Sequence, residues 1–90
     1  MSAKSRRKIV RWVVYLLRCA DNTLYCGITN ALDKRIAAHN CGKGARYTRT
    51  RRPVSVVWTR RCNSKSKALK IEYATKQLSR KEKLALMAGC

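Results

Sequence analysis

The sequence predicts an α/β (α+β) domain in which a three-stranded antiparallel sheet is flanked by helices, in the order ββαβαα. Two apolar runs rich in β-branched and aromatic residues, Ile9 to Arg18 and Leu24 to Thr29, are separated by turn residues and predict a strand hairpin. Apolar residues then recur at helical spacing after Ala31 and again after Ala68. The 90 residues are enough for one domain with a modest core.

The predicted hairpin begins with an uninterrupted apolar stretch, Trp12 to Leu17, which is typical of a strand covered on both faces. The connection, Ala20 to Thr23, contains Asp and Asn, which favour turns. Tyr15 and Tyr25 share a face of the sheet only if the loop has an odd number of residues or a bulge, because side chains alternate along a strand. An even loop would place the two tyrosines on opposite faces.

The first helix is expected to start between Ala31 and Asp33, where an acidic side chain suits the positive end of a helix. Its predicted buried stripe consists of Leu32, Ile36 and Ala37. This stripe would pack the helix against the sheet.

Turn residues divide the second half of the chain. Gly42 and Gly44 are expected to end the first helix and to open a basic loop, which Pro53 closes. A third strand is predicted from Val54 to Thr59. A turn that contains capping residues follows, from Cys62 to Ser64.

Two further helices are predicted near the C-terminus. Apolar spacing indicates an amphipathic helix that runs through Ala68 to about Leu78. The residues from Ser79 to Glu82 form a capping box for a short last helix.

The charge of the chain favours a polyanionic partner. Lys and Arg number 22 against four acids, a formal net charge of +18, so the compact chain repels itself unless anions neutralise it. Nucleic acid is the first partner to consider and an anionic membrane surface the second. No apolar run approaches the ~20 residues of a membrane span, and the basic start lacks a plausible secretory cleavage site. We expect a basic arm over residues 1–8 and a single domain over residues 9–90.

The cysteines favour a reducing compartment. There are five, an odd number, without a C-x-x-C pair or the spacing of a zinc module. Free and mostly buried thiols are therefore expected, in a cytoplasmic protein. The five are Cys19, Cys26, Cys41, Cys62 and Cys90.

The four acids can be sorted by elimination. Asp21 is expected to stabilise a turn, Asp33 the start of a helix, and Glu82 a capping box. Glu72 has no such local role, and a carboxylate at the rim of a basic cleft is a typical holder of Mg²⁺ beside a phosphate. The alternative is a helical ion pair with Lys76, worth about 0.2–0.5 kcal/mol.

Four side chains from the first half of the chain are candidates for chemistry. Arg35 and His39 lie one helical turn apart, so one can hold a phosphate while the other relays a proton near neutral pH. Tyr15 and Tyr25 could orient or activate water if cations near them made their protons easier to lose. The alternative is purely structural: core aromatics and a buried histidine.

The loop from Cys41 to Pro53 is expected to contact nucleic-acid backbone. Its glycines allow close approach to phosphates, although it is not a Walker loop. The alternative is a solvated charged face. The candidate contact residues are Lys43, Arg46, Tyr47, Arg49, Arg51 and Arg52.

Two short motifs, Val13 to Tyr15 and Tyr25 to Gly27, resemble the paired motifs of the GIY-YIG nuclease superfamily. Arg35 stands where that family has its arginine, and His39 where it has His or Tyr. Glu72 falls on the helix that carries the family's metal-binding glutamate.

The resemblance covers roughly Trp12 to Leu78 and is to the small, stand-alone, single-domain bacterial members. The loop before the third strand, Gly42 to Trp58, is also similar to theirs. One departure is Cys26, which replaces the middle Ile of the second motif and should point to the face opposite Tyr25.

The resemblance implies a GIY-YIG endonuclease fold and single-metal hydrolysis of phosphodiester bonds. Glu72 would bind one Mg²⁺ or Mn²⁺, and Arg35 would stabilise the pentacovalent transition state. Tyr15, Tyr25 and His39 would position and deprotonate the attacking water, and which of them is the general base stays open. A sixth residue, Gly27, would keep the second strand thin beside the substrate.

We therefore expect a metal-dependent endonuclease that acts on DNA, as in DNA repair, with structure selectivity or weak sequence specificity that a partner protein could sharpen. The first alternative is a non-catalytic, basic nucleic-acid-binding module on the same scaffold. The second is a basic structural protein, for example one bound to ribosomal RNA.

Overall fold

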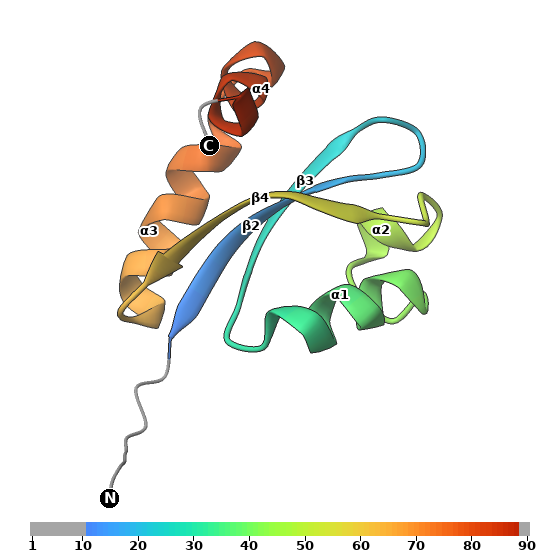
Figure 1. Ribbon diagram of the computed structural model, residues 1–90, viewed down its shortest axis with the longest axis horizontal. Helices are drawn as coiled ribbons and strands as arrows, with labels where there is room; N and C mark the ends of the chain where they lie inside the picture. Colours follow the sequence, from blue (N-terminus) through green and yellow to red (C-terminus); the bar gives the residue numbers. More distant parts are fainter. Residues whose placement is uncertain (1–10, 89–90) are drawn as a thin grey trace, which may run out of the picture.

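A computed structural model describes residues 11–88 as a three-stranded antiparallel sheet, in the strand order β3-β2-β4, with helices on both faces (Figure 1). The predicted fold class is confirmed. The predicted basic arm, residues 1–8, lies outside the described residues, and so does Cys90. The strands are β2 (Trp12–Arg18), β3 (Leu24–Thr29) and β4 (Ser55–Cys62). The helices are α1 (Leu32–Asn40), α2 (Arg46–Arg49), α3 (Lys65–Lys76) and α4 (Arg80–Ala88).

The central strand β2 is buried on both faces, as its apolar sequence predicts. Val14 and Leu16 point into a core cluster that includes Ala68 of α3. Tyr15 and Leu17 point into a second cluster on the opposite face, where α1 packs. In Figure 1, α3 and α4 lie on one side of the sheet and α1 and α2 on the other. The alternation of side chains along β2 therefore divides the core into two parts.

The register of the hairpin places the two candidate tyrosines on the same face. Tyr15 lies opposite Gly27, and Leu17 lies opposite Tyr25. Directly opposed residues share a face and so do residues two apart on one strand, which brings both phenols to the α1 side. The unpaired loop is residues 19–23, an odd number, so this condition of the sequence analysis is met.

Turn chemistry closes the hairpin as expected. Asn22 adopts a left-handed backbone, with φ of 69°. The Asp21 carboxylate accepts hydrogen bonds from both the backbone N–H and the hydroxyl of Thr23.

Three predicted details of the first 64 residues are wrong. The third strand extends to Cys62, because Cys62 pairs with Trp12 and continues the ladder beyond the predicted turn. Ala37 is exposed, and His39 takes its place in the buried face of α1. The loop contains a single helical turn, α2, that the basic residues did not indicate.

Capping is confirmed at both C-terminal helices. The Ser64 hydroxyl accepts from the N–H of Lys67 at 3.1 Å and starts α3. Ser79 and Glu82 exchange backbone-to-side-chain hydrogen bonds of 2.8 and 3.1 Å, the predicted capping box of α4. α3 ends at Lys76, slightly before the predicted limit. Over residues 11–88 no helix has the length and apolar character that crossing a membrane requires.

Candidate active site

A buried hydrogen bond between Tyr15 and His39 forms the centre of the candidate site. The phenol oxygen lies 3.0 Å from Nε2 of the imidazole. Tyr15 comes from the central strand and His39 from the last turn of α1, and they are 1% and 0% exposed. The strand and the helix therefore bring together two side chains that are 24 residues apart in the sequence.

The other imidazole nitrogen is also hydrogen-bonded. Nδ1 of His39 lies 2.7 Å from the hydroxyl of Thr48, which is fully buried. The Thr48 hydroxyl in turn donates to the carbonyl of Ala45, at 3.0 Å. Sequence reasoning missed Thr48, because nothing in the spacing of a basic loop marks one threonine as a partner of the histidine.

Two glycines make room for this pair. A methyl group at position 27 would lie 2.5 Å from the Tyr15 hydroxyl oxygen, and one at position 44 would overlap the His39 ring. Gly27 is buried against Tyr15, which gives a structural reason for glycine at that position. Gly44 was predicted to open the loop and to allow close approach of phosphates, and its contact with His39 gives it a packing role as well.

Aromatic and charged side chains extend from His39 toward the surface. The Tyr25 ring lies edge-on to His39, with centroids 5.5 Å apart, and stacks on Tyr47 at 5.7 Å. The Arg51 guanidinium lies 4.0 Å from the centre of the Tyr47 ring and forms an ion pair of 2.9 Å with Asp21. This series of contacts fixes the loop against the hairpin.

Burial sets the protonation of the central pair. It raises the pKa of Tyr15 above its ordinary value of 10.0, although hydrogen bonding to Arg35 acts in the opposite direction. Burial is also the main cause that lowers the pKa of His39 below 6.5, and the nearby Arg35 charge adds to it. Near neutral pH the pair therefore consists of a phenol and a neutral imidazole.

Glu72 is the fifth candidate side chain. It projects from α3, on the other side of the sheet, and forms an ion pair of 3.5 Å with Lys76, the contact that the structural alternative expects. Burial raises the pKa of the Cys26 thiol to about 11, and the Glu72 charge is the next cause. Cys26 itself points away from Tyr25, as expected, into the core cluster on the α3 side of the sheet. Within residues 11–88, no hydrogen bond joins Glu72 to Tyr15 or to its partners.

The basic loop divides into side chains with structural partners and side chains without them. Besides its ion pair, Arg51 donates to the carbonyl of Tyr47 at 2.7 Å. Arg52 donates to the carbonyl of Arg49 at 2.8 Å and to that of Asn40 at 3.4 Å. Of the loop residues that the structure describes, three cations have no hydrogen bond or ion pair to a side chain or carbonyl: Lys43, Arg46 and Arg49.

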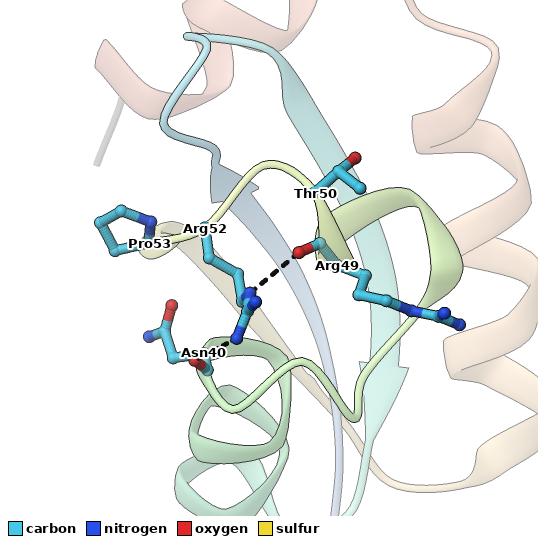
Figure 2. A pocket seen from close by; sticks show the side chains of 5 residues that line it. All are labelled: Asn40, Arg49, Thr50, Arg52 and Pro53. Atoms are coloured by element: carbon cyan, nitrogen blue, oxygen red, sulfur yellow. Dashed lines mark hydrogen bonds between the residues drawn. The ribbon is translucent and has the colours of Figure 1, made fainter.

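An open pocket of about 650 Å³ adjoins this loop (Figure 2). In Figure 2 the Arg52 side chain points toward the carbonyls of Arg49 and Asn40. The Arg49 side chain extends away from Arg52. Arg52 thus connects the ends of α1 and α2, and Arg49 is left to meet solvent or a ligand. The pocket is lined by Asn40, Arg49, Thr50, Arg52 and Pro53.

Comparison with known proteins identifies the class. The GIY-YIG catalytic domain family matches residues 11–85, which is most of the chain. The chain therefore belongs to the GIY-YIG family.

Several similar proteins are described as UPF0213 proteins. One from Staphylococcus haemolyticus is 50% identical over 74 residues, which is 82% of this chain and 90% of the relative. One from Bacillus velezensis is 54% identical over 69 residues, 77% of this chain and 70% of the relative. The solution NMR structure of a UPF0213 protein from Bacillus halodurans has 44% identity and a TM-score of 0.57, and the match covers 87% of this chain and 83% of that one. The solution NMR structure of an E. faecalis protein has 39% identity and the same TM-score, over 81% and 78% of the two chains.

Proposed function

We propose that this chain is a metal-dependent endonuclease that hydrolyses DNA phosphodiester bonds, with structure selectivity or weak sequence specificity. The observation that carries the proposal is the buried Tyr15–His39 hydrogen bond with Arg35 beside it, in a chain of the GIY-YIG family. A phenol backed by a neutral imidazole can accept and pass on one proton, which is what activation of a water requires. The arginine adds a cation beside the place where negative charge would grow.

The proposed proton path runs from water through the phenol to the imidazole. The attacking water gives a proton to the Tyr15 oxygen while the Tyr15 proton moves to Nε2 of His39. The water oxygen then bonds to phosphorus, the bond to the 3′ oxygen breaks, and that oxygen takes a proton from solvent. Because Tyr15 is 1% exposed, water and phosphate would approach from the side of Arg35 and Tyr25, which are both partly exposed.

Glu72 is the proposed metal-holding residue. Residues 11–88 contain no cluster of three or more His, Cys, Asp and Glu side chains, so a site here would have at most two such ligands, of which Glu72 is the proposed carboxylate. A single carboxylate fits Mg²⁺ or Mn²⁺, because Mg²⁺ keeps several waters and takes further oxygens from the substrate phosphate. When bound, the ion would neutralise charge on the phosphate and on the leaving oxygen.

The position of β3 supports the joint use of Glu72 and Tyr25. β3 is an edge strand of the sheet, and Cys26, whose pKa the Glu72 charge helps to raise, follows Tyr25 directly in the chain. A phosphate at an edge can face side chains from both sides of the strand. The net charge of +18 and the unpaired cations of the loop support a nucleic-acid substrate.

Cleavage of supercoiled plasmid and of branched DNA, in Mg²⁺ or Mn²⁺, tests the proposal. The wild-type chain is expected to cut, and Arg35→Ala to lose on the order of 10²–10³-fold in rate. Glu72→Gln should also lose cleavage. Glu82→Gln is the matched control, because glutamine keeps the capping box of α4. Equal nicking by all four proteins would identify a contaminating nuclease and overturn the proposal.

A second candidate function is the non-catalytic nucleic-acid-binding module. The Lys76–Glu72 ion pair favours it, because the lysine already neutralises the only carboxylate proposed to hold a metal. This candidate predicts tight, salt-sensitive binding by the wild-type chain without cleavage in either metal. Glu72→Gln would then bind as tightly as the wild type or more tightly.

A further inference from the structure

We infer that Thr48 is a positioning residue that holds His39 in the tautomer with its proton on Nδ1, so that Nε2 is free to receive the Tyr15 proton. The contacts that carry this inference are three hydrogen bonds in series. They join Tyr15 to His39 at 3.0 Å, His39 to Thr48 at 2.7 Å, and Thr48 to the carbonyl of Ala45 at 3.0 Å.

The direction of the series follows from its last member. The Thr48 hydroxyl lies 3.0 Å from the Ala45 carbonyl, which also accepts from the backbone N–H groups of Thr48 and Arg49, and we infer that the single hydroxyl proton is directed to this carbonyl. The Thr48 oxygen must then accept from His39, which requires a proton on Nδ1. A neutral imidazole carries one N–H, so Nε2 bears a lone pair and accepts from the Tyr15 hydroxyl.

Burial leaves His39 no alternative partner. His39 and Thr48 are both 0% exposed, so water does not replace either hydrogen bond. Gly44 lies against the ring and fixes its place, since a side chain there would overlap Nδ1. The lowered pKa of His39 agrees with a neutral ring. The orientation of the Tyr15 hydroxyl is thus determined by a threonine two hydrogen bonds away.

The role of this tautomer in catalysis rests on the proposed function, whereas the tautomer itself does not depend on it. With the proton on Nδ1, Tyr15 can transfer its proton to Nε2 and become able to take one from water. With the proton on Nε2, the imidazole would donate to the phenol oxygen and could not accept from it. Loss of the Thr48 hydroxyl therefore removes the preference for the Nδ1–H tautomer, which the proton transfer from Tyr15 to His39 requires.

The test is ¹⁵N NMR of the histidine ring in the full chain, near neutral pH. His39 is the only histidine, so its two nitrogen signals need no assignment by mutation. The wild type should show a protonated Nδ1 and an unprotonated Nε2. Thr48→Val, which replaces the hydroxyl by a methyl group, should shift the ring toward the Nε2–H form, and Thr48→Ser should restore the wild-type pattern.

The matched control is Thr75→Val. Thr75 is 4% exposed and its hydroxyl donates only to the carbonyl of Ile71, so the same chemical change there should leave the His39 signals unaltered. An Nε2–H tautomer in the wild type would overturn the inference even if no variant folded. So would an unchanged spectrum in a folded Thr48→Val.

Cleavage assays separate this inference from the proposed function. If the wild type cuts DNA, Thr48→Val should lose about 10–100-fold in kcat with little change in KM, as expected for loss of a group that orients a histidine. Thr48→Ser should recover most of that loss. Wild-type chain that shows the Nδ1–H tautomer but does not cut would refute the nuclease proposal and support the positioning role.

Discussion

The hydroxyl of Tyr15 occupies the space that a side chain at position 27 would fill on the facing strand. The two residues are directly paired in the β2–β3 ladder, and a methyl group on Gly27 would lie 2.5 Å from the phenol oxygen and 2.7 Å from the carbon that carries it. Tyr15 can therefore reach His39 only because the residue opposite has no side chain. The GIY-YIG glycine has a packing role here, whatever its part in substrate binding.

Gly27→Ala should accordingly destabilise the chain by about 1–3 kcal/mol, because the phenol must leave its place or the strands must separate. Unfolding in urea measures the change. The double variant Gly27→Ala/Tyr15→Leu removes both the hydroxyl and the ring carbons that the new methyl group meets, so it should be less destabilised than the sum of the single changes. Additive losses would contradict the predicted contact.

Folding stability should depend on pH through His39. The pKa of His39 is lowered in the folded chain, so the unfolded chain binds more protons just below the ordinary value of 6.5. The contribution of His39 to the free energy of unfolding is fully present above pH 6.5. It is lost as the pH falls from 6.5 toward the lowered pKa of the folded chain. Urea unfolding at a series of pH values measures it. His39→Gln should flatten the dependence in this range, and an equal slope in both proteins would refute the assignment.

Arg49 and Arg52 should respond differently to the same substitution. Arg49 has no structural partner, so Arg49→Gln should weaken DNA binding, reduce the salt slope by about 1 and leave the free energy of unfolding nearly unchanged. Arg52 donates to two carbonyls, so Arg52→Gln should lower stability by on the order of 1 kcal/mol. Binding titrations at several salt concentrations, with urea unfolding of both variants, measure the two effects. Equal losses of stability would contradict the division of the loop.

Arg51 should hold the loop against the hairpin. Its guanidinium contacts Asp21, the carbonyl of Tyr47 and the Tyr47 ring. Arg51→Gln should therefore increase hydrogen exchange at the α2 amides, whereas Asp21→Asn, which removes one of the three contacts, should increase it less. Unchanged exchange in Arg51→Gln would show that backbone contacts alone order this loop.

Patterns close in the sequence predicted most of the fold. The hairpin, the two-sided burial of β2, the capping of α3 and the capping box of α4 all depend on neighbouring residues, and all are confirmed. The predictions were wrong where contacts between residues far apart in the sequence determine the local structure. Cys62 extends β4 because it pairs with Trp12, and Ala37 is exposed because the buried hydrogen bonds of His39 fix the rotation of α1.

The sequence by itself determined the positive charge and indicated the family. It also made the tyrosines, the arginine and the histidine the candidates for the site, because their types and spacings are local properties of the chain. Tertiary structure alone decided that Thr48 completes the histidine's hydrogen bonds, that Arg52 donates to two backbone carbonyls, and that Glu72 forms an ion pair with Lys76. The physical reason is that a hydrogen bond or an ion pair depends on where the backbone carries two groups. The type of a residue shows only which groups its side chain can bind, not which of them lie within reach.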